Sequence, residues 1–122
     1  MKILLPVLSE KENDEEFLDL ALKGAKETII LIVVDADSKE EFGFAASHIQ
    51  RARAVMDQIK ITLGKKRKSS EEILEWGDTN SKILNLALLR KVDKIVLKKQ
   101  ENDYFETLVK KLKKEKLEVE II

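Results

Sequence analysis

Thr28–Asp35 reads TIILIVVD, and Ile29–Val34 within it is the longest unbroken apolar run of the chain. A shorter segment of the same type is Asp93–Leu97, which reads DKIVL. Continuous runs of aliphatic and β-branched residues are typical of strands that are covered on both faces, as in parallel sheets. These two segments therefore predict a parallel sheet that has a layer of helices on each side.

Three further segments complete the predicted sheet. They are Lys2–Leu8, Ser70–Trp76 and Leu117–Ile122. In the last segment Leu117, Val119 and Ile121 alternate with two glutamates. A period of two residues is the pattern of a half-exposed strand, so this segment is predicted to lie at an edge of the sheet.

Segments of helical period lie between the predicted strands. Apolar residues recur at three- and four-residue spacing over about residues 14–23, 39–63, 80–90 and 104–114. Asn13 and Ser38 are the predicted N-caps of the first two helices, and Gly24 and Gly64 are predicted to end them. The order βαβαβαβαβ predicts an α/β fold in one domain over residues 1–122. The predicted fold is an open, doubly wound, five-stranded parallel sheet with right-handed crossovers and helices on both faces.

The composition excludes several classes of function. The 122 residues include no cysteine and one histidine, which rules out disulfide scaffolds, zinc fingers, iron–sulfur clusters and thiol nucleophiles. The 23 basic and 23 acidic residues balance to zero, which argues against general binding to nucleic acid or anionic membranes. No apolar run approaches the roughly 20 residues of a membrane span. We expect a soluble, cytoplasmic protein without metal or cofactor, and its 38% of charged residues is typical of thermophiles.

Motifs of nucleotide binding and catalysis are missing from the sequence. It contains neither GxxxxGK[ST] nor GxGxxG, whose glycines let main-chain amides approach a phosphate. The loop Leu8–Glu12 after the first strand is bulky and acidic, which makes it a poor host for phosphate. The only histidine, His48, falls in the middle of a predicted helix and is interpreted as a surface or partly packed residue. The chain is therefore predicted not to be an enzyme.

Candidate binding residues follow from position, because open α/β sheets bind ligands at the carboxyl ends of their strands. The residues at these ends are Leu8-Ser9, Asp35, Gly77-Asp78 and Lys98-Lys99-Gln100. Asp35 and Asp78 are either ligand contacts or local caps, and Lys98 is either an anion contact or a solvated surface residue. Trp76 lies beside them and either stacks on a base or packs against a helix.

Four segments resemble the universal stress protein family in their order and spacing. They are Met1–Val7 (MKILLPV), Ile29–Asp35 (IILIVVD), Gly77-Asp78 followed by Ile83-Leu84 and Ala87, and Val92–Leu97 (VDKIVL). They are similar to the family's MKILxPVD, hVVD, GDPxxxIL and ADLIVMG segments, and the match covers nearly the whole chain. The resemblance implies a sheet of order 3-2-1-4-5, in which the strand order reverses between the first and fourth strands.

The chain departs from the ATP-binding members of that family at two places. Their loop after the fourth strand reads G-x2-G-x9-G followed by Ser or Thr, whereas Lys98–Thr107 (KKQENDYFET) contains no glycine. Leu8 stands where the family has an aspartate that approaches adenine. The residues that still match the nucleotide-side pattern are Val34, Asp35, Gly77 and Asp78. The resemblance thus implies the branch of the family that does not bind ATP.

The resemblance also implies a homodimer, because family members commonly dimerise through the last strand. The candidate dimer residues are Leu117, Val119 and Ile121. The first hypothesis is therefore a universal-stress-like protein that binds no ATP, is not an enzyme, and acts through homodimerisation and protein contacts. The alternative is a module that binds a small anion or nucleoside in the strand-end crevice. Its candidate ligand contacts are Val34, Asp35, Gly77, Asp78 and Lys98. A nucleotide hydrolase that depends on Ser9 is the least supported hypothesis.

Overall fold

The computed structural model describes residues 1–35 and 49–122. Within them five strands alternate with four α-helices. In chain order the elements are β1 (Lys2–Pro6), the 3-10 helix η1 (Glu10–Glu12), α1 (Glu15–Ala21), β2 (Glu27–Val34), α2 (Ile49–Lys65), β3 (Ser69–Trp76), α3 (Thr79–Leu89), β4 (Lys94–Leu97), α4 (Asp103–Lys113) and β5 (Val119–Ile121). The predicted order of strands and helices is confirmed.

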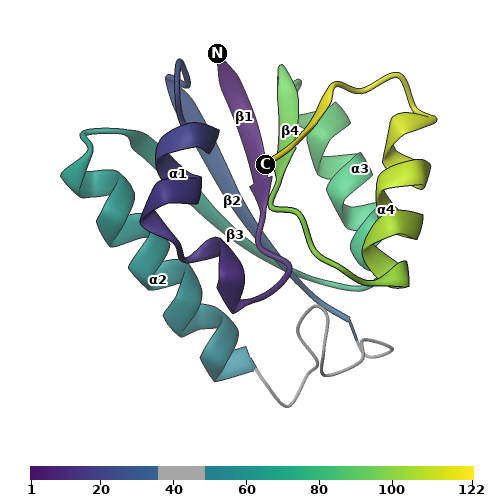
Figure 1. Cartoon of the computed structure of the whole chain (residues 1–122), viewed down its shortest axis with the longest axis horizontal. Helices are drawn as coiled ribbons and strands as arrows, with labels where there is room; N and C mark the ends of the chain where they lie inside the picture. Colours follow the sequence, from purple (N-terminus) through teal and green to yellow (C-terminus); the bar gives the residue numbers. More distant parts are fainter. Residues whose placement is uncertain (36–48) are drawn as a thin grey trace.

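The five strands form one parallel sheet of order β3-β2-β1-β4-β5, as predicted (Figure 1). Strand β2 pairs with β3 over its whole length, from Glu27 opposite Ser69 to Val34 opposite Trp76. Strand β1 lies between β2 and β4, and among residues 1–35 and 49–122 the strand β5 pairs only with β4. The strand order therefore reverses between β1 and β4.

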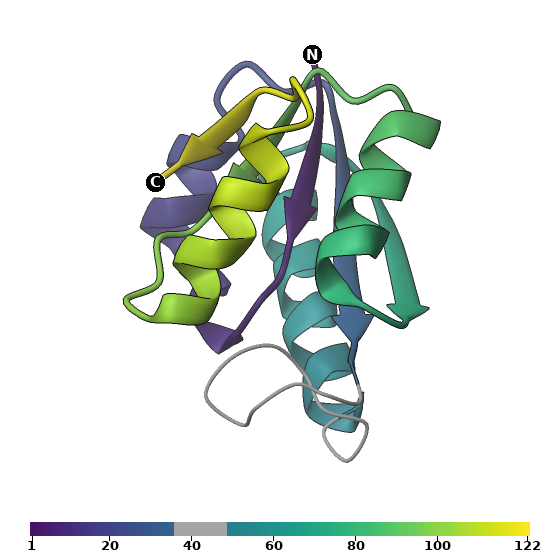
Figure 2. The same ribbon diagram turned by 90° about the vertical axis from the view of Figure 1, so that its right-hand side faces the viewer.

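Helices α1 and α2 cover one face of the sheet, and α3 and α4 cover the other (Figures 1 and 2). Strand β2 supplies both faces, because successive side chains of a strand point to opposite sides. Its residues Ile30, Ile32 and Val34 belong to the core under α1 and α2. The alternate residues Ile29, Leu31 and Val33 belong to the core under α3 and α4. This double burial explains why the run is apolar at every position.

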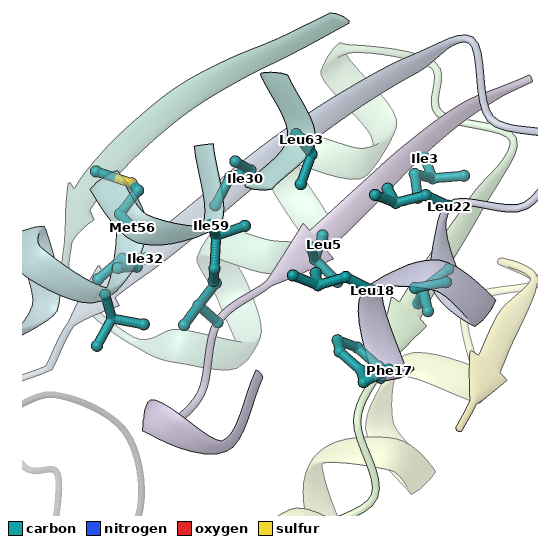
Figure 3. Close-up of a cluster of buried hydrophobic side chains, with 14 of the residues drawn as sticks. Ile3, Leu5, Phe17, Leu18, Leu22, Ile30, Ile32, Met56, Ile59 and Leu63 are labelled. Atoms are coloured by element: carbon teal, nitrogen blue, oxygen red, sulfur yellow. The ribbon is translucent and has the colours of Figure 1, made fainter. Parts of the chain in front are cut away.

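The core under α1 and α2 is shown in Figure 3. Helix α1 contributes Phe17 and Leu18 beside β1, together with its C-cap residue Leu22, and α2 contributes Met56, Ile59 and Leu63 beside β2. Most of these side chains have no exposed surface or almost none. Burying a large aliphatic side chain stabilises the fold by about 1.5–3 kcal/mol, so this layer contributes much of the force that holds the helices on the sheet.

Two predicted helix signals are wrong in detail. Asp14, not Asn13, is the N-cap of α1, and its carboxylate accepts a hydrogen bond from the Phe17 amide at 3.1 Å. The side-chain carboxamide of Asn13 instead donates to the carboxamide oxygen of Gln58 at 2.6 Å. Gly64 does not end α2 but lies within it.

The exit from α2 is made by Arg67, which adopts the left-handed conformation with φ of 56°. The Lys68 amide then donates to the Leu63 carbonyl at 3.0 Å, as in a Schellman motif. Lys91 after α3 and Lys116 after α4 also have positive φ, at 54° and 59°. The chain thus uses basic residues at positions where glycine is the usual choice.

Other boundaries differ because neighbouring elements limit them. Strand β5 was predicted over Leu117–Ile122 but has three residues. Its partner β4 offers only the pairing from Ile95 to Leu97, so the ladder ends there. The predicted start of the second helix at residues 39–48, including the cap at Ser38 and His48, lies outside the described residues.

Two isoleucines of α2 provide a matched test of this packing. Ile59 has no exposed surface and Ile61 is 59% exposed. We expect Ile59→Ala to lower the free energy of unfolding by about 2–4 kcal/mol, since it leaves a cavity under the helix. The control Ile61→Ala should change it by less than about 0.5 kcal/mol. Urea unfolding of both variants measures this, and equal losses would contradict the assigned helix face.

Candidate functional site

The candidate site is the place where the loops after β1 and β4 meet, at the reversal of strand order. Ligands of open α/β sheets bind at such a switch point. After β1 the chain continues through the buried residues Val7 and Leu8 to Ser9, the N-cap of η1. After β4 it runs from Lys98 to Gln100, and the Gln100 side chain is buried against the first loop.

The Glu12 carboxylate occupies this meeting point, and its residue has no exposed surface. Its Oε2 atom accepts hydrogen bonds from the amides of Leu8 at 2.5 Å and Ser9 at 2.7 Å. Its Oε1 atom accepts from the Gln100 carboxamide at 2.6 Å and from the Ser9 hydroxyl at 3.2 Å. Each carboxylate oxygen therefore has two donors, and Glu12 links the two loops across 88 positions of sequence.

Burial raises the pKa of Glu12 from 4.5 to about 7, although the hydrogen bonds from Ser9, Leu8 and Gln100 lower it. Desolvation wins because the charged form loses its water entirely. The protonated form also has a partner, since Oε1 lies 3.2 Å from the Ser9 hydroxyl. That hydroxyl in turn lies 3.4 Å from the Gln100 carbonyl oxygen. The cluster can thus hold the proton without leaving a polar atom unsatisfied.

The side of the switch point that faces α4 is apolar. Leu8 is 2% exposed and belongs to the same buried cluster as Leu97 and Phe105. This is the position at which the resembling family has an aspartate. The structure places a hydrocarbon side chain there, packed in the same cluster as the apolar side chains of α4.

The predicted residues Val34, Asp35, Gly77 and Asp78 lie together at the carboxyl ends of β2 and β3. The Gly77 amide donates to the Val34 carbonyl at 3.1 Å, and Gly77 has a φ of 144° that disfavours other residues. Asp35, 7% exposed, accepts hydrogen bonds from the amide of Thr79 at 3.2 Å and its hydroxyl at 3.4 Å. These contacts tie the end of β2 to the start of α3.

Asp78 is the N-cap of α3, which agrees with the prediction that this residue is a local cap. Its carboxylate accepts from the amide of Ser81 at 2.9 Å and from the Ser81 hydroxyl at 2.8 Å. These hydrogen bonds hold the pKa of Asp78 below its usual range, because they favour the charged form. A capping carboxylate of this kind stabilises the helix by about 1 kcal/mol.

Lys98 does not join these four residues. Its ammonium lies 3.9 Å from the Asp14 carboxylate and 5.2 Å from the centre of the Phe17 ring. Both partners belong to the start of α1, whereas Asp35 and Asp78 contact the start of α3. The five residues predicted to form one ligand site therefore lie at two separate places.

A cavity of about 330 Å³ lies beside the start of α3. Its lining includes Asp78, Asn80, Asp103, Tyr104, Thr107 and Lys111. Burial raises the pKa of Tyr104, as do the charges of Asp35 and Asp78, whereas a hydrogen bond to Thr79 opposes the rise. Sequence reasoning identified only Asp78 among the lining residues. The three- and four-residue spacing of Tyr104, Thr107 and Lys111 along α4 is the signal that was available.

Three further features concern base stacking, metal binding and membrane insertion. Trp76 is 54% exposed at the end of β3, so stacking on a base and packing against a helix both stay predictions. Across residues 1–35 and 49–122, no group of three or more acidic, histidine or cysteine side chains could hold a metal ion. No helix in the described part of the chain has the length and apolar character needed to cross a bilayer.

The raised pKa of Glu12 makes stability depend on pH. Since the pKa is about 7 in the folded chain against 4.5 as the reference, the native state binds this proton more tightly than the unfolded state. This contribution, about 3 kcal/mol, is present at low pH and is lost as the pH rises through 7. Urea unfolding at about pH 5 and about pH 8 should show this loss in the native chain but not in Glu12→Gln. The control Glu10→Gln should keep the native dependence, and an unchanged profile in Glu12→Gln would contradict the assignment.

Comparisons with known proteins bear on the fold. Neither a protein-family model nor a curated protein sequence matches the chain. Among solved structures, the hypothetical protein MJ0577 matches with a TM-score of 0.70 and 20% identity, over 99% of this chain and 94% of that one. A universal stress protein family member from Burkholderia pseudomallei matches with a TM-score of 0.70 and 17% identity, over 99% and 94%.

A third solved structure is a universal stress protein in complex with cAMP. It matches with a TM-score of 0.65 and 15% identity, over 100% of this chain and 95% of that one. In each comparison the similarity spans nearly the whole of both chains, and the strand order agrees with the one that the resemblance implies. The chain therefore has the fold of the universal stress protein family.

Proposed function

We propose that this chain is a universal-stress-type protein that does not bind ATP at its switch point and acts through protein contacts as a homodimer. The observation that carries the proposal is the contact of Glu12 with Gln100 at 2.6 Å. It joins the loops after β1 and β4 through buried polar groups. A nucleotide in this crevice would have to separate the two loops and leave those groups without partners, which is costly.

The loop after β4 supports the same conclusion. Lys98–Thr107 contains no glycine, and main-chain amides approach a triphosphate most closely where side chains are missing. The Asn102 side chain already accepts a hydrogen bond from the Phe105 amide at 2.7 Å, as the N-cap of α4. One of the amides that a phosphate would use at this helix start is thus satisfied within the chain.

We also infer that the protein is not an enzyme. Ser9, the nucleophile of the least supported hypothesis, accepts a hydrogen bond from the Lys11 amide at 3.2 Å and contacts the Glu12 carboxylate. It therefore serves as a helix cap in a buried cluster. A catalytic hydroxyl has to be free to reach its substrate, whereas that of Ser9 is engaged by hydrogen bonds within the cluster.

Strand β5 supports the homodimer. It is the outermost strand on its side of the sheet, and Ile121 is 37% exposed. Leu117 and Val119 are partly buried against the core under α3 and α4. An apolar edge strand is open to pairing with another strand, and two copies related by a two-fold axis would cover each other.

Isothermal titration calorimetry tests the missing ATP site. We expect no binding heat for ATP, ADP, AMP or cAMP at millimolar concentrations, because the switch point is filled by the chain's own side chains. One structural neighbour is a complex with cAMP, so that nucleotide belongs in the series. Micromolar affinity for ATP would overturn the proposal.

The oligomeric state tests the role of β5. We expect Ile121→Lys to convert a dimer into a monomer in light scattering after size exclusion, since a charge on an edge strand blocks pairing. The matched control is Ile61→Lys, which places the same change on an exposed position of α2 and should leave the dimer intact. A native chain that is monomeric at about 100 µM, where a dimer with a Kd of 1 µM would form, contradicts this part of the proposal.

The second candidate function is the binding of a small ligand in the cavity beside α3. The observation in its favour is the 330 Å³ space itself, lined by charged, hydroxyl and aromatic groups from α3 and α4. A nucleotide or nucleoside that gives heat in the titration above, and loses it in Asp78→Ala, would favour this candidate. The heat would have to persist in Gln100→Ala, which changes the switch point instead.

A further inference from the structure

The donors around Glu12 come from two loops that are far apart in the sequence. A capping box at η1 accounts for the bond from the Ser9 amide to Glu12, because this motif pairs the N-cap amide with the N3 side chain. It does not account for the Leu8 amide at 2.5 Å or the Gln100 carboxamide at 2.6 Å. These two donors lie before the cap and after β4, outside the helix.

When Glu12 is ionised, its charge is met by these donors and not by a cation. Within residues 1–35 and 49–122, no lysine or arginine forms an ion pair with its carboxylate. Arg51 pairs with Glu10 at 2.5 Å, and Lys98 lies 3.9 Å from Asp14. Convergent N–H groups without a cation are the way in which proteins bind oxyanions through fixed dipoles.

We propose that the Leu8 amide, the Ser9 amide and the Gln100 carboxamide form an oxyanion-binding site that Glu12 fills as an internal ligand. The ligand class is a carboxylate, because each of its two oxygens receives two donors. The contact keeps the site closed to anions from other molecules. The inference rests on the proposed function and deepens it, since it names the group that takes the place of an external ligand at the switch point.

The chain connection explains why an external anion does not compete in the native protein. Glu12 is three residues from Ser9, so its carboxylate stays close to the donors even when a hydrogen bond breaks. A group held on a short tether competes as if it were present at millimolar concentration or more. Removing the Glu12 side chain should therefore expose donors that a small free carboxylate can reach.

The experiment uses Glu12→Ala and sodium formate, with sodium chloride at the same ionic strength as the reference salt. We expect Glu12→Ala to have a lower Tm than the native chain and to regain stability in formate with saturation. The rise should reach about 5 °C when formate is at roughly ten times its Kd. The native chain should show no such rise, because its site is filled.

Glu10→Ala is the matched control, since Glu10 lies on the same 3-10 helix but pairs with Arg51 at the surface. Its Tm should respond equally to formate and chloride. Equal responses of Glu12→Ala to the two salts would overturn the proposal. So would a formate effect that persists undiminished in Glu12→Ala/Gln100→Ala, since that variant lacks a donor of the site.

A second measurement decides the case if Glu12→Ala does not fold in either salt. In the native protein, labelled with ¹⁵N and ¹³C, we expect scalar couplings across hydrogen bonds from the Leu8 and Ser9 amide nitrogens to the Glu12 carboxyl carbon. Their absence would overturn the proposal. The outcome is independent of the nucleotide titration: ATP binding by the native chain would refute the proposed function, whereas a missing formate effect would refute only the oxyanion site.

Discussion

Strand β2 has to be buried on both of its faces, and the rest of the structure follows from this requirement. Six apolar side chains, from Ile29 to Val34, leave neither face of this strand fit for water. One helix layer cannot cover them, so the chain must cross the sheet repeatedly and place helices on each side. Parallel strands joined by helices satisfy that need and bring all the strand ends that carry ligand loops to one edge. The position of the candidate site is therefore a consequence of how the most hydrophobic segment is covered.

At that edge of the sheet the chain has to bury polar groups as well as apolar ones. These groups need hydrogen-bond partners within the protein, because water does not reach them. The Val7 amide still donates to the Leu31 carbonyl of β2 at 2.8 Å. The amides of Leu8 and Ser9 that follow need another acceptor, because a buried N–H without one is costly. Glu12 supplies the acceptor, and Gln100 completes its shell from the far side of the switch point. The burial that raises the pKa of Glu12 and the hydrogen bonds that oppose the rise belong to the same arrangement. The same polar contacts hold the loops of β1 and β4 together.

Much of the fold could be predicted from the sequence, because the spacing of apolar residues indicates where most strands and helices of this chain lie. The continuous run in β2, the alternation in the last segment and the helical stripes depend only on near neighbours. The cap of α1 shows the limit: Asn13 and Asp14 are both good caps, but Asn13 is the C-cap of η1 and its side chain bonds to Gln58, 45 positions away. The candidate site was harder to predict than the fold. Its central residue, Glu12, is buried, whereas glutamate is normally found at the surface. The spacing of Ser9 and Glu12 signals a capping box, but nothing local indicates that Gln100 would lie against it.

The parallel topology has an electrical consequence. Helices α1, α2, α3 and α4 all run opposite to the strands, so their dipoles add up along one axis, where those of an antiparallel bundle would cancel. The side chains oppose this cumulative field at both poles of the molecule. Anionic caps such as Asp14 and Asp78 face the positive pole, and the left-handed exits at Arg67, Lys91 and Lys116 bring cations to the negative one. The residues that cap and end the helices thus act together as counter-charges to the aligned helix dipoles.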